Sequence, residues 1–199
     1  MKKILLSLLS LLLVLSGNAQ LKSPSDFLGY ELGTQFTRHH QVIDYVNHVA
    51  ENSGFAQTAS YGKTNEGRTL QLVYLSSAEN LAQLESLRKD HLRSIGYEQG
   101  AKETTKEYSI IWLSYNVHGN ESTSTEAALK TLHTLVTEKQ DWLENLIVIM
   151  DPCINPDGRD RYVNWYNQVK STPFDSSPLA NEHFEDWPGG RYNHYYFDL

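Results

Sequence analysis

Two apolar runs flank an amphipathic stretch in residues 108–150. The first run, Tyr108 to Val117, contains consecutive Ile, Ile, Trp and Leu and is predicted to be a buried strand. Ser122 to Glu138 has apolar residues at helical spacing, and Leu146 to Met150 is apolar throughout. A strand, a helix and an apolar strand in this order predict a βαβ unit, because parallel strands are usually joined by a crossover helix. The fold class expected is therefore α/β, with a mostly parallel sheet.

Shorter patterns surround this unit. Apolar residues three and four positions apart predict one helix from Arg38 to Asn52 and another from Leu81 to Ile95. Phe55 to Tyr61 and Thr69 to Leu75 are predicted strands, joined as a hairpin by the turn-forming residues between them. The stretch from Arg159 to Leu199 contains Pro and Gly-Gly and is expected to be a loop.

The N-terminus has the pattern of a secretory signal peptide. Lys2 and Lys3 precede an apolar run shorter than the about 20 residues that span a membrane. Small residues before Gln20 predict cleavage after Ala19, so residues 1–19 are a predicted signal peptide and residues 20–199 the mature chain. The mature protein is expected to be exported, periplasmic or extracellular, and free of the membrane. An N-terminal membrane anchor is the alternative interpretation.

Composition narrows the class of protein further. The 199 residues include 17 basic and 24 acidic ones, and the net charge of −7 argues against a nucleic-acid partner. The one cysteine, Cys153, excludes an intramolecular disulfide and a Cys-rich zinc site, and it is expected to be buried. About 180 mature residues suffice for one domain core. The sequence gives no indication of the oligomeric state.

Two polar motifs follow the two strands of the βαβ unit, where α/β proteins bind their ligands. His118 and Glu121, three residues apart, can face one point above the sheet and are candidate zinc ligands. A structural alternative is a helix start at which Glu121 offsets the helix dipole. Asn155-Pro156-Asp157-Gly158 is interpreted as a turn after the second strand.

Other charged residues are weaker candidates for the site. Arg159 and Arg161 are expected to be solvated or paired with Asp157 and Asp160. Five other histidines are expected to face solvent on helical segments: His39, His40, His48, His91 and His133. Either His183 or His194, in the late loop, is a further candidate metal ligand.

Four segments together resemble the zinc carboxypeptidase family, the carboxypeptidase A-like metallopeptidases. They are the hairpin segment 61–70 with Glu-Gly-Arg at its turn, His118-Gly119-Asn120-Glu121, Asn155-Pro156-Asp157-Gly158, and residues 190–199. They occur in the family's order, and the similarity spans about residues 38–199. The resemblance implies a mixed, mostly parallel eight-stranded sheet with helices on both faces.

The resemblance also implies roles for individual residues. His118 and Glu121 are implied ligands of one Zn2+ ion. Arg191 matches the arginine that polarises the scissile carbonyl and stabilises the oxyanion. Asp198 matches the carboxylate that accepts a hydrogen bond from the first ligand His. The implied activity is removal of C-terminal amino acids from peptides, with a free-C-terminus peptide as substrate.

The sequence departs from the family pattern in three respects. Tyr196 stands where many members have Gly, and Asn120 where the pancreatic-type enzymes have Arg. The family's carboxylate-binding Asn-Arg pair, third zinc ligand and general-base Glu would all follow Leu199. Residues 20–199 are therefore expected to be an incomplete catalytic domain that by itself binds zinc weakly and shows no turnover.

Two alternatives from other functional classes remain open at this point. The first alternative to the carboxypeptidase is a non-catalytic peptide- or glycan-binding module on the same fold. The second is a zinc amidohydrolase that acts on acylated amino acids or cell-wall peptides. His118→Ala should leave ligand binding intact only in the non-catalytic module.

Overall fold

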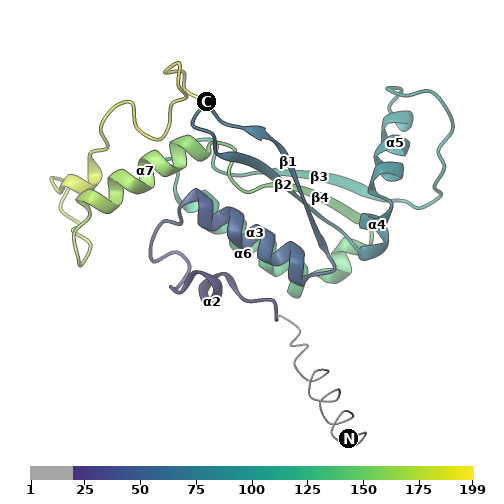
Figure 1. Ribbon diagram of the computed structural model, residues 1–199, viewed down its shortest axis with the longest axis horizontal. Helices are drawn as coiled ribbons and strands as arrows, with labels where there is room; N and C mark the ends of the chain where they lie inside the picture. Colours follow the sequence, from purple (N-terminus) through teal and green to yellow (C-terminus); the bar gives the residue numbers. More distant parts are fainter. Residues whose placement is uncertain (1–19) are drawn as a thin grey trace, which may run out of the picture.

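The computed structural model describes residues 20–199, which contain a four-stranded mixed sheet (Figure 1). Its strands are β1 (Ala56–Lys63), β2 (Thr69–Leu75), β3 (Ser109–Ser114) and β4 (Leu146–Asp151), in the spatial order β1-β2-β4-β3. β1 and β2 form the predicted antiparallel hairpin, and β3 and β4 the predicted parallel pair. β2 pairs antiparallel with β4, so two of the three strand pairings in residues 20–199 are antiparallel, and the sheet is mixed rather than mostly parallel as predicted. The predicted signal peptide lies outside the described residues.

Helices lie on both faces of this sheet. The α-helices are α2 (Pro24–Leu28), α3 (His39–Asn52), α4 (Ala78–Ala82), α5 (Leu84–Ser94), α6 (Thr123–Thr137) and α7 (Pro156–Val169), with 3-10 turns at Gln140–Glu144 and Asn181–His183. Helices α3 and α6 pack against one another and share a core with the sheet (Figure 1). Residues of α4 and α5 line a hollow on the opposite face with Ile110, Ile147 and Ile149. The α/β prediction is confirmed, and within residues 20–199 no helix is long and apolar enough to cross a membrane.

The core is formed mainly where the sequence pattern placed it. Val42, Val46 and Val49 of α3 are completely buried, as are Leu129 and Leu132 of α6. Cys153 is also buried, as expected. These side chains remove one apolar stripe per helix from water, the main stabilising term for an amphipathic helix.

Three element predictions need correction. β3 is not a buried strand, because it lies at the edge of the sheet, and Trp112 is 56 % exposed. The helix predicted for residues 81–95 is two helices that meet at Gln83, and the first begins at Ala78 after the Ser77 cap. The hydroxyl of Ser77 accepts the backbone N–H of Asn80, a cap that favours an earlier helix start.

The loop predicted from Arg159 to Leu199 is also wrong over its first part, because Pro156–Val169 form α7. The Asn155 side chain accepts the backbone N–H of Gly158, and Pro156 occupies the first helical position. An Asn cap followed by Pro is a helix start, so the segment interpreted as a turn begins a helix. Arg159 and His39, expected at the surface, are buried.

Candidate metal centre

Residues 115–121 carry the β3 strand into α6 and contain both candidate zinc ligands. Asn116 adopts a left-handed conformation, with φ of 58°. Its side-chain amide donates hydrogen bonds to the carbonyls of His118 (2.8 Å) and Glu121 (3.3 Å). A single buried side chain therefore shapes the turn that presents His118 and Glu121. The sequence analysis missed Asn116, although Asn tolerates left-handed backbone better than most residues.

His118 and Glu121 face one another, as the sequence predicted. His118 Nδ1 lies 3.0 Å from Glu121 Oε1. His118 Nε2 faces two acceptors, the carboxylate of Asp198 at 3.1 Å and the carbonyl of Leu199. The proton of a neutral imidazole therefore belongs on Nε2, which leaves a lone pair on Nδ1. With the proton on Nε2, the lone pairs of Nδ1 and Glu121 Oε1 lie close enough to bind one metal ion together.

Arg191 and Asp198 complete the cluster. Arg191 Nε donates to Asp198 at 2.8 Å, and Arg191 Nη1 lies 3.5 Å from Glu121 Oε1. The hydrogen bond from Arg191 lowers the pKa of Asp198, and the same contact raises the pKa of Arg191. The structure thus brings together the four site residues that the sequence indicated: His118, Glu121, Arg191 and Asp198.

The donor set fits zinc chemistry. An imidazole nitrogen and a carboxylate oxygen are ordinary zinc ligands, and a carboxylate on the other imidazole nitrogen fixes the tautomer in such sites. Within residues 20–199, however, the Nδ1 of His118 and the carboxylate of Glu121 belong to no group of three such ligand atoms within 4.8 Å. The described residues therefore provide two ligands at this centre.

Three glycines allow the three motifs to meet. A Cβ atom on Gly119 would lie 2.1 Å from the carbonyl carbon of Gly158, and one on Gly158 would lie 2.2 Å from the carbonyl oxygen of Gly190. The backbone N–H of Gly119 also donates to the carbonyl of Gly190 at 2.9 Å. Only residues without a Cβ permit this approach, so these glycines hold the turn after β3, the start of α7 and the Arg191 segment in contact.

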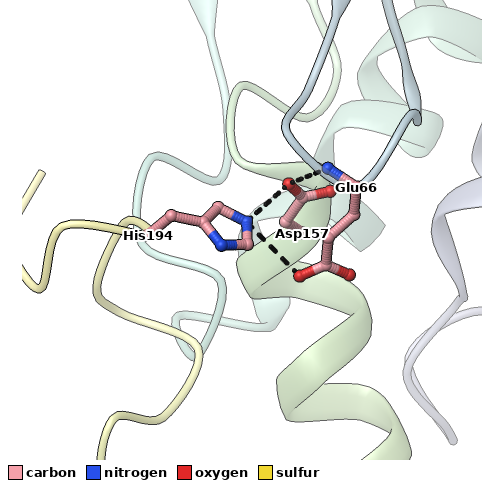
Figure 2. A group of neighbouring side chains, drawn as sticks. All are labelled: Glu66, Asp157 and His194. Atoms are coloured by element: carbon pink, nitrogen blue, oxygen red, sulfur yellow. Dashed lines mark hydrogen bonds and ion pairs between the residues drawn. The ribbon is translucent and has the colours of Figure 1, made fainter.

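Figure 2 shows a second polar cluster. Its members are Glu66 in the hairpin turn, Asp157 at the start of α7 and His194 in the late loop, and their ligand atoms lie within 4.8 Å of one another. Burial alone would raise the pKa of Asp157, but hydrogen bonds from Thr64, Arg68 and His194 lower it. Of the two late histidines considered as ligands, His194 reaches this cluster, whereas His183 faces the carbonyl of Asp175.

Comparison with solved structures identifies the fold. The chain is similar to the carboxypeptidase A from Helicoverpa armigera, with 21 % identity and a TM-score of 0.50, over 79 % of this chain and 32 % of that one. Bovine thrombin-activatable fibrinolysis inhibitor, in complex with tick carboxypeptidase inhibitor, matches at 15 % identity and a TM-score of 0.44, over 63 % and 33 % of the two chains. The match to the Helicoverpa armigera enzyme shows a carboxypeptidase A-like fold. This chain spans about a third of the length of each of these two structures.

The family follows from the sequence itself. A zinc carboxypeptidase family model matches residues 42–195, which is most of the chain. This chain therefore belongs to the zinc carboxypeptidase family, as the four motifs indicated. No protein with a curated description matches it significantly.

Tyr196 shows how the chain accommodates one departure from the family pattern. It has φ of 62°, the left-handed conformation that favours glycine. Its ring stacks on Trp187, with ring centroids 4.8 Å apart. The backbone at residue 196 thus adopts a glycine-like conformation although the residue is Tyr.

Proposed function

We propose that the chain functions in an exported zinc metallocarboxypeptidase, with His118 and Glu121 as ligands of one zinc ion. The observation that carries the proposal is the 3.0 Å approach of His118 Nδ1 to Glu121 Oε1 while Nε2 faces Asp198. A bound zinc ion would polarise a substrate carbonyl and lower the pKa of its water. The family supports hydrolysis of peptides at their C-terminal end.

In this proposal the residues around the ligands have separate tasks. Asp198 holds the proton of His118 on Nε2 and so keeps Nδ1 available. Arg191, held at Nε by Asp198, donates through its remaining N–H groups to a carbonyl oxygen that becomes negative. Its side chain is 36 % exposed, so a peptide can reach it.

Zinc titration of the 199-residue chain tests the ligand assignment. With two ligands where three are usual, we expect weak binding of one ion and no turnover. His118→Gln should abolish binding, whereas His183→Gln, at an exposed position in the 3-10 turn Asn181–His183, should leave it unchanged. Equal zinc affinity of the wild type and His118→Gln would contradict the proposal.

Peptide binding separates the enzyme from the two alternatives. A peptide with a free C-terminus should bind more tightly with zinc than with a chelator, and His118→Ala should remove this difference. A peptide affinity that changes neither with zinc nor with His118→Ala would favour a non-catalytic module. Preference for an N-acylated amino acid over the peptide would favour the amidohydrolase.

Intact-mass measurement of the exported protein tests cleavage after Ala19.

A further inference from the structure

The cluster of Glu66, Asp157 and His194, called here the anchoring cluster, joins three parts of the chain (Figure 2). His194 Nε2 lies 3.1 Å from Asp157 Oδ2 and 3.4 Å from Glu66 Oε1. Asp157 is almost buried, with 7 % of its side chain exposed, whereas His194 is 35 % exposed. The buried carboxylate therefore provides a fixed point to which a surface segment is tied.

The surface segment is a tight turn. Tyr192 and Asp198 form an antiparallel bridge, and the backbone N–H of Asn193 donates to the carbonyl of Phe197. The side-chain oxygen of Asn193 accepts the backbone N–H groups of Tyr195 and Phe197. His194 thus belongs to a closed turn, residues 192–198, that ends at the site residue Asp198 and directly follows Arg191.

His194 is the link from this turn to the hairpin and α7. Arg161 holds the preceding backbone through the carbonyls of Gly189 and Tyr192. Among the described residues after Tyr192, every hydrogen bond or ion pair to the hairpin or α7 passes through His194. Residues 198 and 199 otherwise contact the zinc-ligand candidate His118 and the site residue Arg191.

A metal ion is a competing explanation for the anchoring cluster, but its carboxylates already have cationic partners. Arg68 Nη1 contacts Glu66 at 2.5 Å and Asp157 at 2.7 Å, and Arg68 Nε contacts Asp160 at 2.7 Å. Arg161 lies 3.6 Å from Glu66. A metal ion would have to compete with these guanidinium groups, so the geometry favours an ion-pair anchor.

We propose that His194 is a positioning residue that holds the 192–198 turn in place, and with it Asp198 against His118 Nε2 and Arg191 beside Glu121. The catalytic meaning of this anchor rests on the proposed function. The anchor itself can be measured without zinc, because Asp198 fixes the tautomer of His118.

The experiment compares His194→Ala, His194→Gln and the control His183→Ala by 15N NMR of the histidine side chains at about pH 8, above the ordinary histidine pKa. The wild type and His183→Ala should show His118 protonated on Nε2. His194→Ala should lower the Nε2–H population and reduce zinc affinity about 3- to 10-fold, less than a direct loss of Asp198. His194→Gln should restore both, because its amide can donate to Asp157.

The possible outcomes are distinct. An unchanged His118 signal in folded His194→Ala would overturn the positioning role. The positioning role would also be overturned if His118→Gln still bound zinc stoichiometrically and the double variant His118→Gln/His194→Ala did not. The anchoring cluster would then be a metal site. If the wild type binds no zinc but His194→Ala still shifts the His118 tautomer, the anchor stands and the proposed function fails.

Discussion

Two arginine–carboxylate pairs in this molecule have the same chemistry and opposite surroundings. Arg159 is completely buried and contacts Glu126 at 2.5 Å, whereas Arg191 is 36 % exposed and contacts Asp198 at 2.8 Å. Arg159 also donates to the carbonyls of Thr37 and Ser122. Glu126 accepts the backbone N–H and the hydroxyl of Thr37, both at 2.7 Å. The buried pair is held by several protein partners, whereas Arg191 of the exposed pair keeps N–H groups that can donate to a ligand.

This difference in burial distinguishes a charged pair that stabilises the fold from one that can serve the site. Arg159 ties the start of α6 to α7 and to the segment before α3, and burial makes any loss of a partner expensive. The side chains of Arg191 and Asp198 are 36 % and 52 % exposed, and an exposed ion pair stabilises a fold weakly. The exposed pair therefore contributes through the groups that it positions.

Glu126→Ala should give the largest effect on folding. It leaves Arg159 buried with an unpaired charge and Thr37 with unsatisfied donors, and should lower the free energy of unfolding by about 3–5 kcal/mol. Urea denaturation followed by circular dichroism measures the loss. Glu85→Ala, which removes the exposed partner of Arg88, is the control and should not shift the midpoint. Equal stability of the two variants would remove the distinction between buried and exposed pairs.

Gly119→Ala should be the next largest change, because its Cβ has no space against Gly158. Overpacking of this kind costs about 1–3 kcal/mol, and here it also separates the three motifs. Gly54→Ala is the matched control, since nothing lies within 4 Å of its Cβ position and its φ is not in the positive range. A stable Gly119→Ala variant with wild-type zinc affinity would show that the glycine contact does not organise the site.

The sequence predicted the parts of the fold that depend on local pattern. The hairpin, the βαβ unit, α3 and α6 follow from periodicity, and His118 and Glu121 from their spacing at a strand end. β3 was assigned to the interior because an apolar strand has the same pattern at an edge as in the centre of a sheet. Its neighbours decide its burial, and they are distant in sequence.

The missed features depend on contacts between distant segments. Arg159 is buried because Glu126 and Thr37 meet it from other elements, 33 and 122 residues away along the chain. No local pattern distinguishes such an arginine from a solvated one. The start of α7, in contrast, had a local signal in Asn155-Pro156, which the turn interpretation overlooked.

Asp198→Asn tests whether the exposed pair of Arg191 and Asp198 affects zinc affinity rather than folding. The change weakens the acceptor on His118 Nε2, and loss of such a partner lowers zinc affinity about 10- to 100-fold. Asp186→Asn, on an exposed position of the same late segment, is the control. Competition with a chromophoric chelator measures affinity, and urea denaturation should show unchanged folding. A loss of folding stability with unchanged zinc affinity would make Asp198 a structural residue.

The smallest effect expected is a pH dependence, and it contrasts two buried carboxylates near the site. Hydrogen bonds from Thr64, Arg68 and His194 outweigh burial and lower the pKa of Asp157, whereas burial raises the pKa of Asp151, despite its hydrogen bonds from Tyr61 and Cys153. A lowered folded pKa means that the ionised form stabilises the fold above the unfolded pKa of about 4, and that this stability is lost as the pH falls through the folded value. A raised folded pKa has the opposite effect: the ionised form destabilises the fold, and stability is gained as the pH falls and the group is protonated.

Urea midpoints from pH 7 down to pH 3 test these signs. The stability advantage of the wild type over Asp157→Asn should shrink as the pH falls, because protonation removes the charge that Arg68 and His194 bind. For Asp151→Asn the advantage of the wild type should instead grow, because protonation relieves the cost of a buried charge. If both differences moved in the same direction, the cationic partners of Asp157 would not distinguish it from Asp151, and the anchoring cluster would lose its electrostatic basis.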